Sequence, residues 1–278
     1  MNVLVLSGGG VFGALHLGAL HKKVNKYRVI AGTSVGAIIG ALLAVGYEPL
    51  ELLRVMPDTG LITPDIQLVG FGAASQEPLT RFIETLLKEK CDGQLLTFRE
   101  IHTRFDVDLV VTGTCLDTQC SEYFHRHSHP HMSVIDALRI SCCVPLLFPH
   151  IQYKGKTYVD GFVTDNFPLA FTRTYVDTYF PEKEVEILIH AQNIVHRAMA
   201  LTATGTTDTK DTKDTKDTTC WSTFHGYIQT LFRIFLDSKS YDYGDVPVLE
   251  LAPKTGVNMM KYTQHDLERL FNEGYETT

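Results

Sequence analysis

The sequence has no excess of positive charge. Its 278 residues include 25 lysines and arginines against 32 aspartates and glutamates, for a formal net charge of -7 at pH 7. Proteins that bind nucleic acids usually present a basic surface to the phosphates, so this balance argues against a nucleic-acid partner. The hydrophobic share of 44% is ordinary for a globular chain, and the length is sufficient to bury a large core.

The paired cysteine spacings of a zinc site are also missing. Six cysteines are present, and two of them, Cys142 and Cys143, are adjacent, an arrangement that rarely forms a disulfide. We therefore expect buried, reduced thiols in a reducing compartment and no structural metal.

A secretory signal and a clear membrane span are lacking as well. The first residues run directly into an apolar strand and a glycine loop, without a basic region. The uncharged run 29–47 is long enough to cross a bilayer, but it contains four glycines together with Thr33 and Ser34. We interpret it as a strand, a turn and a helix, and we expect a cytoplasmic protein with at most a peripheral contact with membranes.

The turn in this run has the sequence Gly32-Thr33-Ser34-Val35-Gly36. Gly-x-Ser-x-Gly between a strand and a helix is the nucleophile-elbow pattern, in which the serine stands at the apex of a sharp turn. Glycines are needed because side chains beside the serine would collide with the adjacent strand or helix. Ser34 is therefore a candidate nucleophile at a helix N-terminus, although the pentapeptide also fits a turn without chemistry.

A second glycine turn comes earlier, between an apolar strand (3–6) and a helix (14–20). Its spacing matches the dinucleotide pattern G-x-G-x-x-G, but the acidic residue expected at the end of the next strand is missing. Turns that follow parallel strands lie at the same edge of a sheet. We therefore expect an oxyanion hole beside Ser34, formed by backbone N–H groups of Gly8, Gly9, Gly10, Val11, Phe12 and Gly13.

Local signals predict a mixture of helices and strands in the next part of the chain. Thr97 with Glu100, and Ser133 with Asp136, are spaced as capping boxes at helix starts. The alternating run 107–114 predicts a strand, and residues 151–159 predict a hairpin that ends at Asp160-Gly161. The pattern indicates an α/β fold with a mainly parallel sheet.

Three further segments give predictions, and two of them have more than one interpretation. Histidines 125, 127, 129 and 131 occupy every second position, which allows a metal site or, more simply, a solvated loop. Residues 196–220 include a repeated Asp-Thr-Lys unit and predict a disordered insertion. Apolar residues at helical spacing over 221–235 predict either a core helix or a helix that docks on lipid.

In their order, the glycine loop, the Gly-x-Ser-x-Gly turn and Asp160-Gly161 resemble the patatin-like phospholipase family. The resemblance extends over roughly residues 1–190. It includes the run from Ala137 to Pro145, then Phe148-Pro149, Tyr158-Val159, Asn166 and Pro168.

The resemblance implies a three-layer α/β/α fold and a Ser34–Asp160 dyad without a catalytic histidine. Ser34 would attack a lipid acyl ester and form an acyl-enzyme. Asp160 would take the serine proton and later activate water. No cofactor is implied. We divide the chain into a catalytic core (1–195), the insertion (196–220) and a C-terminal segment that completes the domain (221–278), and we expect transient contact with membranes.

The sequence departs from the family pattern at Phe12, where a basic residue is common, and at Phe162, which follows Asp160-Gly161. Two other functions stay open. An ordinary α/β-hydrolase would use a Ser-His-Asp triad, with His190, His225 or His265 as its base. A catalytically silent relative would only bind lipid.

Overall fold

The computed structural model describes residues 1–22, 26–56, 71–181, 188–194, 227, 230–231, 244–254, 257 and 262–278. Among these residues, an eight-stranded sheet has the order β5-β6-β3-β2-β1-β7-β8, with β4 also paired to β3. The strands are β1 (Asn2–Leu6), β2 (Val29–Thr33), β3 (Asp108–Cys115), β4 (Cys120–Phe124), β5 (Ile151–Tyr153), β6 (Lys156–Asp160), β7 (Leu188–Ile194) and β8 (Val248–Leu251).

The sheet is mainly parallel, as the sequence predicted. Strands β3, β2, β1, β7 and β8 run in one direction, and β4, β5 and β6 add antiparallel pairs at the β3 end. The helices are α1 (Gly13–His21), α2 (Val35–Ala44), α3 (Pro49–Val55), α4 (Glu77–Lys90), α5 (Phe98–Phe105), α6 (Val134–Ser141), α7 (Leu169–Tyr179) and α9 (Gln264–Thr277), with the short 3-10 turns η1 (Gly10–Phe12) and η3 (Gly161–Val163).

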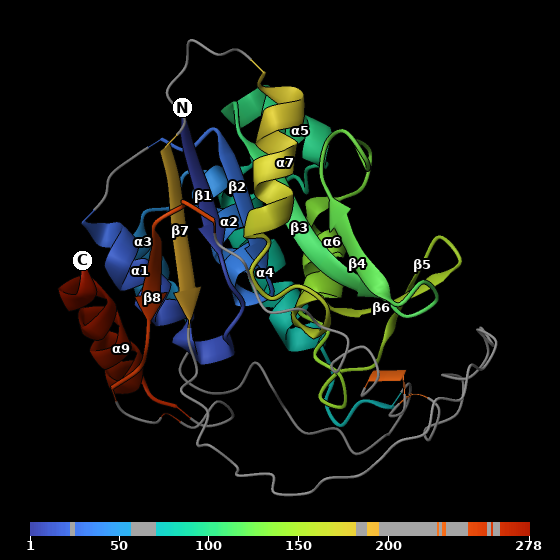
Figure 1. The fold of residues 1–278 in the computed structure, drawn as a ribbon. Coiled ribbons are helices and arrows are strands. Elements are labelled where there is room, and N and C mark those ends of the chain that lie inside the picture. The colour runs from blue at the N-terminus through green and yellow to red at the C-terminus, as the bar shows by residue number, and fades with distance from the viewer. Residues whose placement is uncertain are drawn as a thin grey trace, which may run out of the picture.

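Helices cover both faces of the sheet (Figure 1). Successive strand residues point to opposite faces. Leu4 and Leu6 therefore pack into the larger core cluster, with side chains of α1, α2, α4, α5, α6 and α9. Val3 and Val5 point the other way and pack with Leu169, Tyr175 and Val176 of α7. This three-layer arrangement confirms the predicted α/β fold.

The C-terminal helix α9 crosses α1 at two glycines. A Cβ atom added at Gly18 would lie 1.9 Å from the carbonyl oxygen of Phe271, and one added at Gly274 would lie 2.1 Å from that of Leu15. The two helix backbones therefore approach closely, and α9 is held against the same core as the first strand.

The two predicted capping boxes have different outcomes. At the start of α5, Thr97 Oγ1 accepts from the N–H of Glu100, and the Glu100 carboxylate accepts from the N–H of Thr97, which confirms the first box. Ser133 precedes α6, but its side chain makes no capping hydrogen bond. Its backbone forms a β-bridge with Thr97 instead, and Asp136 pairs with Arg139. The prediction of a capping box at Ser133 and Asp136 is therefore wrong.

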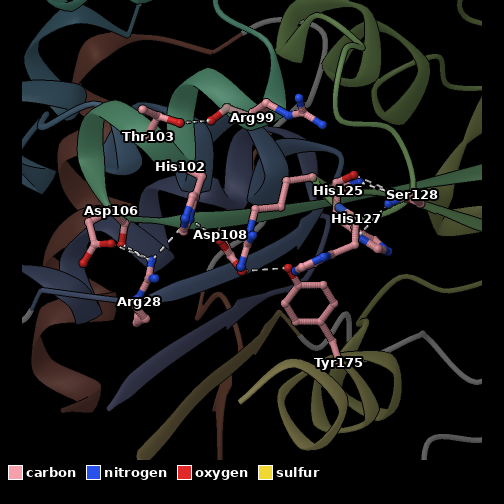
Figure 2. A network of polar contacts seen from close by, with 11 residues as sticks. Arg28, Arg99, His102, Thr103, Asp106, Asp108, His125, His127, Ser128 and Tyr175 are labelled. Carbon is pink, nitrogen blue, oxygen red and sulfur yellow. Dashed lines mark hydrogen bonds and ion pairs between the residues drawn. The ribbon is translucent and has the colours of Figure 1, made fainter.

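A buried carboxylate, Asp108, ties elements on both faces to the start of β3 (Figure 2). Its oxygens lie 2.7 Å from His102 Nδ1 of α5 and 2.6 Å from Arg126 Nε, and they accept from the Tyr175 hydroxyl of α7 at 2.8 Å. A carboxylate without solvent contact needs such partners. The cluster lies at the first residue of β3, whereas Asp160 pairs with Gly113, near the other end of that strand.

The histidine loop lies beside this cluster. His125 is buried, and its ring packs edge-on to that of Tyr175. His127 is stacked on Tyr179, with 3.6 Å between ring centroids. The loop is therefore not uniformly solvated, because α7 covers part of it. Within the described residues, no group of three or more histidine, cysteine or acidic side chains could hold a metal ion.

Several predictions fall on residues outside the described ranges. The insertion 196–220 and His225 lie outside them, as does most of the aromatic segment 221–235. Of that segment, residues 227, 230 and 231 are described as helical. The uncharged run 29–47 is divided between β2, the turn and α2, as predicted. In the described part of the chain, no helix is both long and apolar enough to span a bilayer.

Candidate active site

Ser34 occupies the turn between β2 and α2 with a positive φ, at φ 53° and ψ -124°. Residues other than glycine rarely adopt such a backbone conformation, so the surrounding structure must enforce it. A Cβ atom at Gly32 would lie 2.5 Å from the backbone of Gly36, and one at Gly36 would lie 2.5 Å from the carbonyl oxygen of Ser7. The two glycines are therefore required where the sequence placed them, and the serine stands alone at the apex.

The sheet brings Ser34 and Asp160 together through one edge of β3. Strand β2 pairs with β3 up to Thr33 opposite Thr112, while β6 runs the other way and ends with Asp160 opposite Gly113. Strand β4 pairs with the same part of β3 and must take the other edge. Strands β2 and β6 therefore meet head to head along one edge, and the residues at their ends become neighbours.

The two side chains form a direct hydrogen bond. Ser34 Oγ donates to Asp160 Oδ2 at 2.8 Å, and the backbone N–H of Phe162 donates to Oδ1 at 2.9 Å. Asp160 has no exposed surface, while Ser34 is 9% exposed. Burial raises the pKa of Asp160 to about 7, against the lowering effect of these two hydrogen bonds. The carboxyl group is thus suited to exchange a proton near neutral pH.

Two further residues contact Ser34 from the end of α6. The Ser141 hydroxyl accepts from the backbone N–H of Ser34 at 2.9 Å. The Cys142 thiol lies within hydrogen-bonding reach of the serine hydroxyl, and its burial near Asp160 raises its pKa well above the usual range. Sequence reasoning assigned neither a role. Both lie in the run that resembles the family, but their contact with Ser34 spans more than a hundred residues.

The glycine loop offers fewer free donors than its sequence indicated. The N–H of Gly8 donates to the carbonyl of Asn166, that of Phe12 to Gly9, and that of Gly13 to Gly10 and Val11. The N–H groups of Gly9, Gly10 and Val11 donate to no backbone carbonyl within the described residues. Asn166, which was not predicted as a site residue, also directs its amide toward the carbonyl of Gly8.

The loop faces Ser34 closely. A Cβ atom at Gly8 would lie 3.2 Å from that of Ser34, and one at Gly13 would lie 2.5 Å from the side chain of Val35. The free N–H groups of Gly9, Gly10 and Val11 begin one residue after the contact with Ser34. The candidate oxyanion hole is therefore narrowed from six residues to these three.

The described histidines proposed for a triad do not contact Ser34. His190 pairs with Leu4 in the middle of the sheet, and its ring packs against Tyr27. His265 is exposed in the first turn of α9. Among the described residues, the serine hydroxyl has a carboxylate and a thiol as neighbours and no imidazole.

Sequence comparison identifies the family. The sequence pattern of the patatin-like phospholipase family matches residues 4–173, which include Ser34, Asp160 and the glycine loop. The chain belongs to the patatin-like phospholipase family.

Individual relatives of this patatin-like chain agree with that assignment. The probable lipid hydrolase 463L of Invertebrate iridescent virus 6 is 32% identical over 186 residues, covering 63% of this chain and 64% of the relative. Triacylglycerol lipase ptl3 of Schizosaccharomyces pombe is 25% identical over 216 residues, covering 70% of this chain and 44% of the relative. The matches thus span less than two thirds of either relative.

The crystal structure of VipD from Legionella pneumophila has a similar fold. It aligns with 99% of the patatin-like chain and 65% of VipD, with a TM-score of 0.58 and 15% sequence identity. At this identity the likeness concerns the fold alone.

Proposed function

We propose that the chain is a serine lipid acyl hydrolase that cleaves carboxylic esters of phospholipids or related lipids through Ser34 and Asp160. The observation that carries this proposal is the 2.8 Å hydrogen bond from a serine in a strained elbow to a fully buried carboxylate. Family membership and relatives named lipid hydrolase and triacylglycerol lipase support the substrate class.

In the first half of the reaction, Ser34 Oγ forms a bond to the ester carbonyl carbon as its proton passes to Asp160. The carbonyl oxygen becomes an oxyanion, and the free N–H groups of Gly9, Gly10 and Val11 are the donors available to hold it. Such donors typically contribute about 10²–10³ in rate each. When the C–O bond breaks, the leaving alcohol takes the proton from Asp160, and the acyl group stays on Ser34.

In the second half, water replaces the alcohol. The water oxygen attacks the acyl carbon as Asp160 accepts a proton from the water. The proton passes from Asp160 to Ser34 Oγ when the fatty acid leaves. A carboxylate with an ordinary pKa near 4 is a weak base for this task. The rise of the Asp160 pKa to about 7 brings it closer to the working pH, which favours general base catalysis.

The test is hydrolysis of a mixed lipid extract by the full chain, with products identified by mass spectrometry. Ser34→Ala and Asp160→Asn are expected to abolish acyl release while each variant keeps a cooperative thermal transition. A fluorophosphonate probe should label the wild-type chain and not Ser34→Ala. Unlabelled wild-type protein that binds vesicles without releasing fatty acid would instead identify a silent lipid-binding relative.

We further propose that the active-site end contacts lipid surfaces transiently. Phe162 and Leu146 are large apolar side chains that are 41% and 45% exposed. Both residues are close along the chain to groups that form hydrogen bonds with Asp160. The N–H of Phe162 itself donates to the Asp160 carboxylate, and the backbone N–H of Asp160 donates to the carbonyl of Cys143, which precedes Leu146 in the same loop. Two apolar side chains beside the site suit a substrate that must leave a membrane.

A further inference from the structure

Ser7, the residue before the glycine loop, has its backbone and side-chain polar groups engaged. Its N–H donates to the carbonyl of Gln192 at 3.1 Å, and its hydroxyl accepts from the N–H of Ile194 at 2.8 Å. Its carbonyl oxygen lies 3.0 Å from Nε2 of His16. The end of β1 is thereby joined both to β7 and to α1.

His16 is a buried titratable group that the proposed reaction does not use. It has no exposed surface, and burial lowers its pKa to about 4, so the imidazole is neutral at pH 7. A neutral imidazole carries one N–H, and the Ser7 carbonyl can only accept, so the proton is on Nε2. Nδ1 must then accept a hydrogen bond. It lies 3.1 Å from Oε1 of Gln192, so we assign the Gln192 amide in the flipped orientation, in which its NH₂ group takes this position and donates to Nδ1.

These contacts fix a single peptide plane. The Ser7–Gly8 peptide has its carbonyl held by His16 and its N–H held by the carbonyl of Asn166 at 3.1 Å. A peptide bond is planar, so restraining both ends prevents it from rotating. The next residues are glycines, which tolerate many backbone conformations. Without this fixed plane, the N–H groups that follow could turn away from Ser34.

We propose that His16 is a positioning residue of the oxyanion hole, which holds the Ser7–Gly8 peptide and thereby directs the N–H groups of Gly9, Gly10 and Val11 toward the reacting carbonyl. The inference rests on the proposed hydrolase function for its catalytic consequence. The side chain itself touches neither the substrate nor Ser34. Its effect is transmitted through the carbonyl of Ser7.

The test compares His16→Gln with His16→Asn in the full chain. Both variants place a neutral amide in the same site, but glutamine reaches as far as Nε2, whereas asparagine reaches only the level of Nδ1. His16→Asn is expected to lower kcat on a soluble short-chain ester by roughly 100-fold with KM within a few fold, the usual cost of a misplaced reacting group. His16→Gln should keep most of the activity.

A transition-state analogue links the loss to the oxyanion hole. A trifluoromethyl ketone forms an oxyanion when serine adds to it, so its Ki should rise in His16→Asn in proportion to the fall in kcat/KM. Leu20→Ala is the matched control, because it removes buried contacts one turn further along α1. It should lower the thermal midpoint while leaving kcat unchanged.

Hydrogen exchange over residues 7–12, followed by mass spectrometry, examines the positioning without using activity. Exchange should be faster in His16→Asn than in His16→Gln. Equal kcat values and equal exchange in the two variants would overturn the inference. Should the wild-type chain lack hydrolysis that depends on Ser34, faster exchange in His16→Asn would still support the role of His16 in loop geometry, and the hydrolase function alone would be rejected.

Discussion

At the scale of single residues, Asp160 combines complete burial with two hydrogen bonds that only partly stabilise its charge. Its pKa is near 3.8 when solvated and about 7 in the fold. Between these pH values the folded chain binds this proton and the unfolded chain does not. The stability that the neutral carboxyl retains below pH 4 is therefore lost as pH rises through 7.

Replacing Asp160 with asparagine should remove this pH dependence. The unfolding free energy of Asp160→Asn relative to the wild type is expected to increase by on the order of 4 kcal/mol between pH 4 and pH 8, as the pKa difference implies. Urea denaturation at several pH values measures it. Ser34→Ala keeps the carboxyl group and serves as the control. It should retain the fall in stability with pH or enlarge it, because the hydrogen bond that it removes is one that lowers the pKa of Asp160. Parallel curves for the wild type and Asp160→Asn would contradict the raised pKa.

Sequence reasoning predicted the residues whose own neighbourhood dictates their conformation. Gly32 and Gly36 could be read as elbow residues because tight turns require glycine at fixed positions. It failed where a distant group decides the outcome. The N–H of Gly8 is taken by Asn166, and the cap expected at Ser133 is replaced by a bridge to Thr97. Neither partner is visible in the local pattern.

At the scale of elements, the fold class followed from strands that alternate with helices, but the meeting of β2 and β6 did not. The hairpin that delivers Asp160 was predicted from its turn, whereas its place on β3 depends on pairing between residues 113–115 and 158–160. Register is set by the packing of whole strands. The resemblance to the family implied that Ser34 and Asp160 would meet, and the sheet shows how they are brought together.

The crossing of α1 and α9 gives a prediction at this scale. Gly18→Ala should destabilise the fold by about 2–3 kcal/mol, because the added Cβ meets the backbone of α9 and the helices must separate. Gly40→Ala in α2 is the control. Its Cβ meets one side-chain atom of Ile30 at 2.7 Å, so a smaller loss is expected. Chemical denaturation measures both, and equal losses would show that the crossing is not constrained by Gly18.

At the scale of the whole molecule, the two ends of the sheet have different tasks. The cluster around Asp108 joins α5 and α7 to the first residue of β3, where its charges are mutually satisfied (Figure 2). Asp160 lies further along β3, where it pairs with Gly113, and the strained Ser34 lies beside it. The satisfied polar contacts of Asp108 and the strained backbone of Ser34 are therefore separated along the sheet.

The exposed apolar residues Phe162 and Leu146, at the end of the molecule that carries Ser34 and Asp160, lead to the last prediction. Phe162→Ser with Leu146→Ser should reduce vesicle binding and hydrolysis of vesicle phospholipid by about 10-fold or more, since each half-exposed side chain contributes on the order of 1 kcal/mol when buried in lipid. Hydrolysis of a soluble short-chain ester should change by no more than about threefold, because the N–H of residue 162 still donates to Asp160 and the lost lipid contact acts only at the vesicle surface.

Tyr275→Ser provides the matched control. Tyr275 is 42% exposed, but it lies near the end of α9 beside Lys22, at the opposite end of α1 from the glycine loop. Co-sedimentation with phosphatidylcholine vesicles and fatty acid release should therefore be unchanged. If the double variant loses activity equally on vesicles and on the soluble ester, Phe162 and Leu146 shape the acyl pocket. Loss confined to vesicles means that they hold the catalytic end against the lipid surface, where Ser34 meets its substrate.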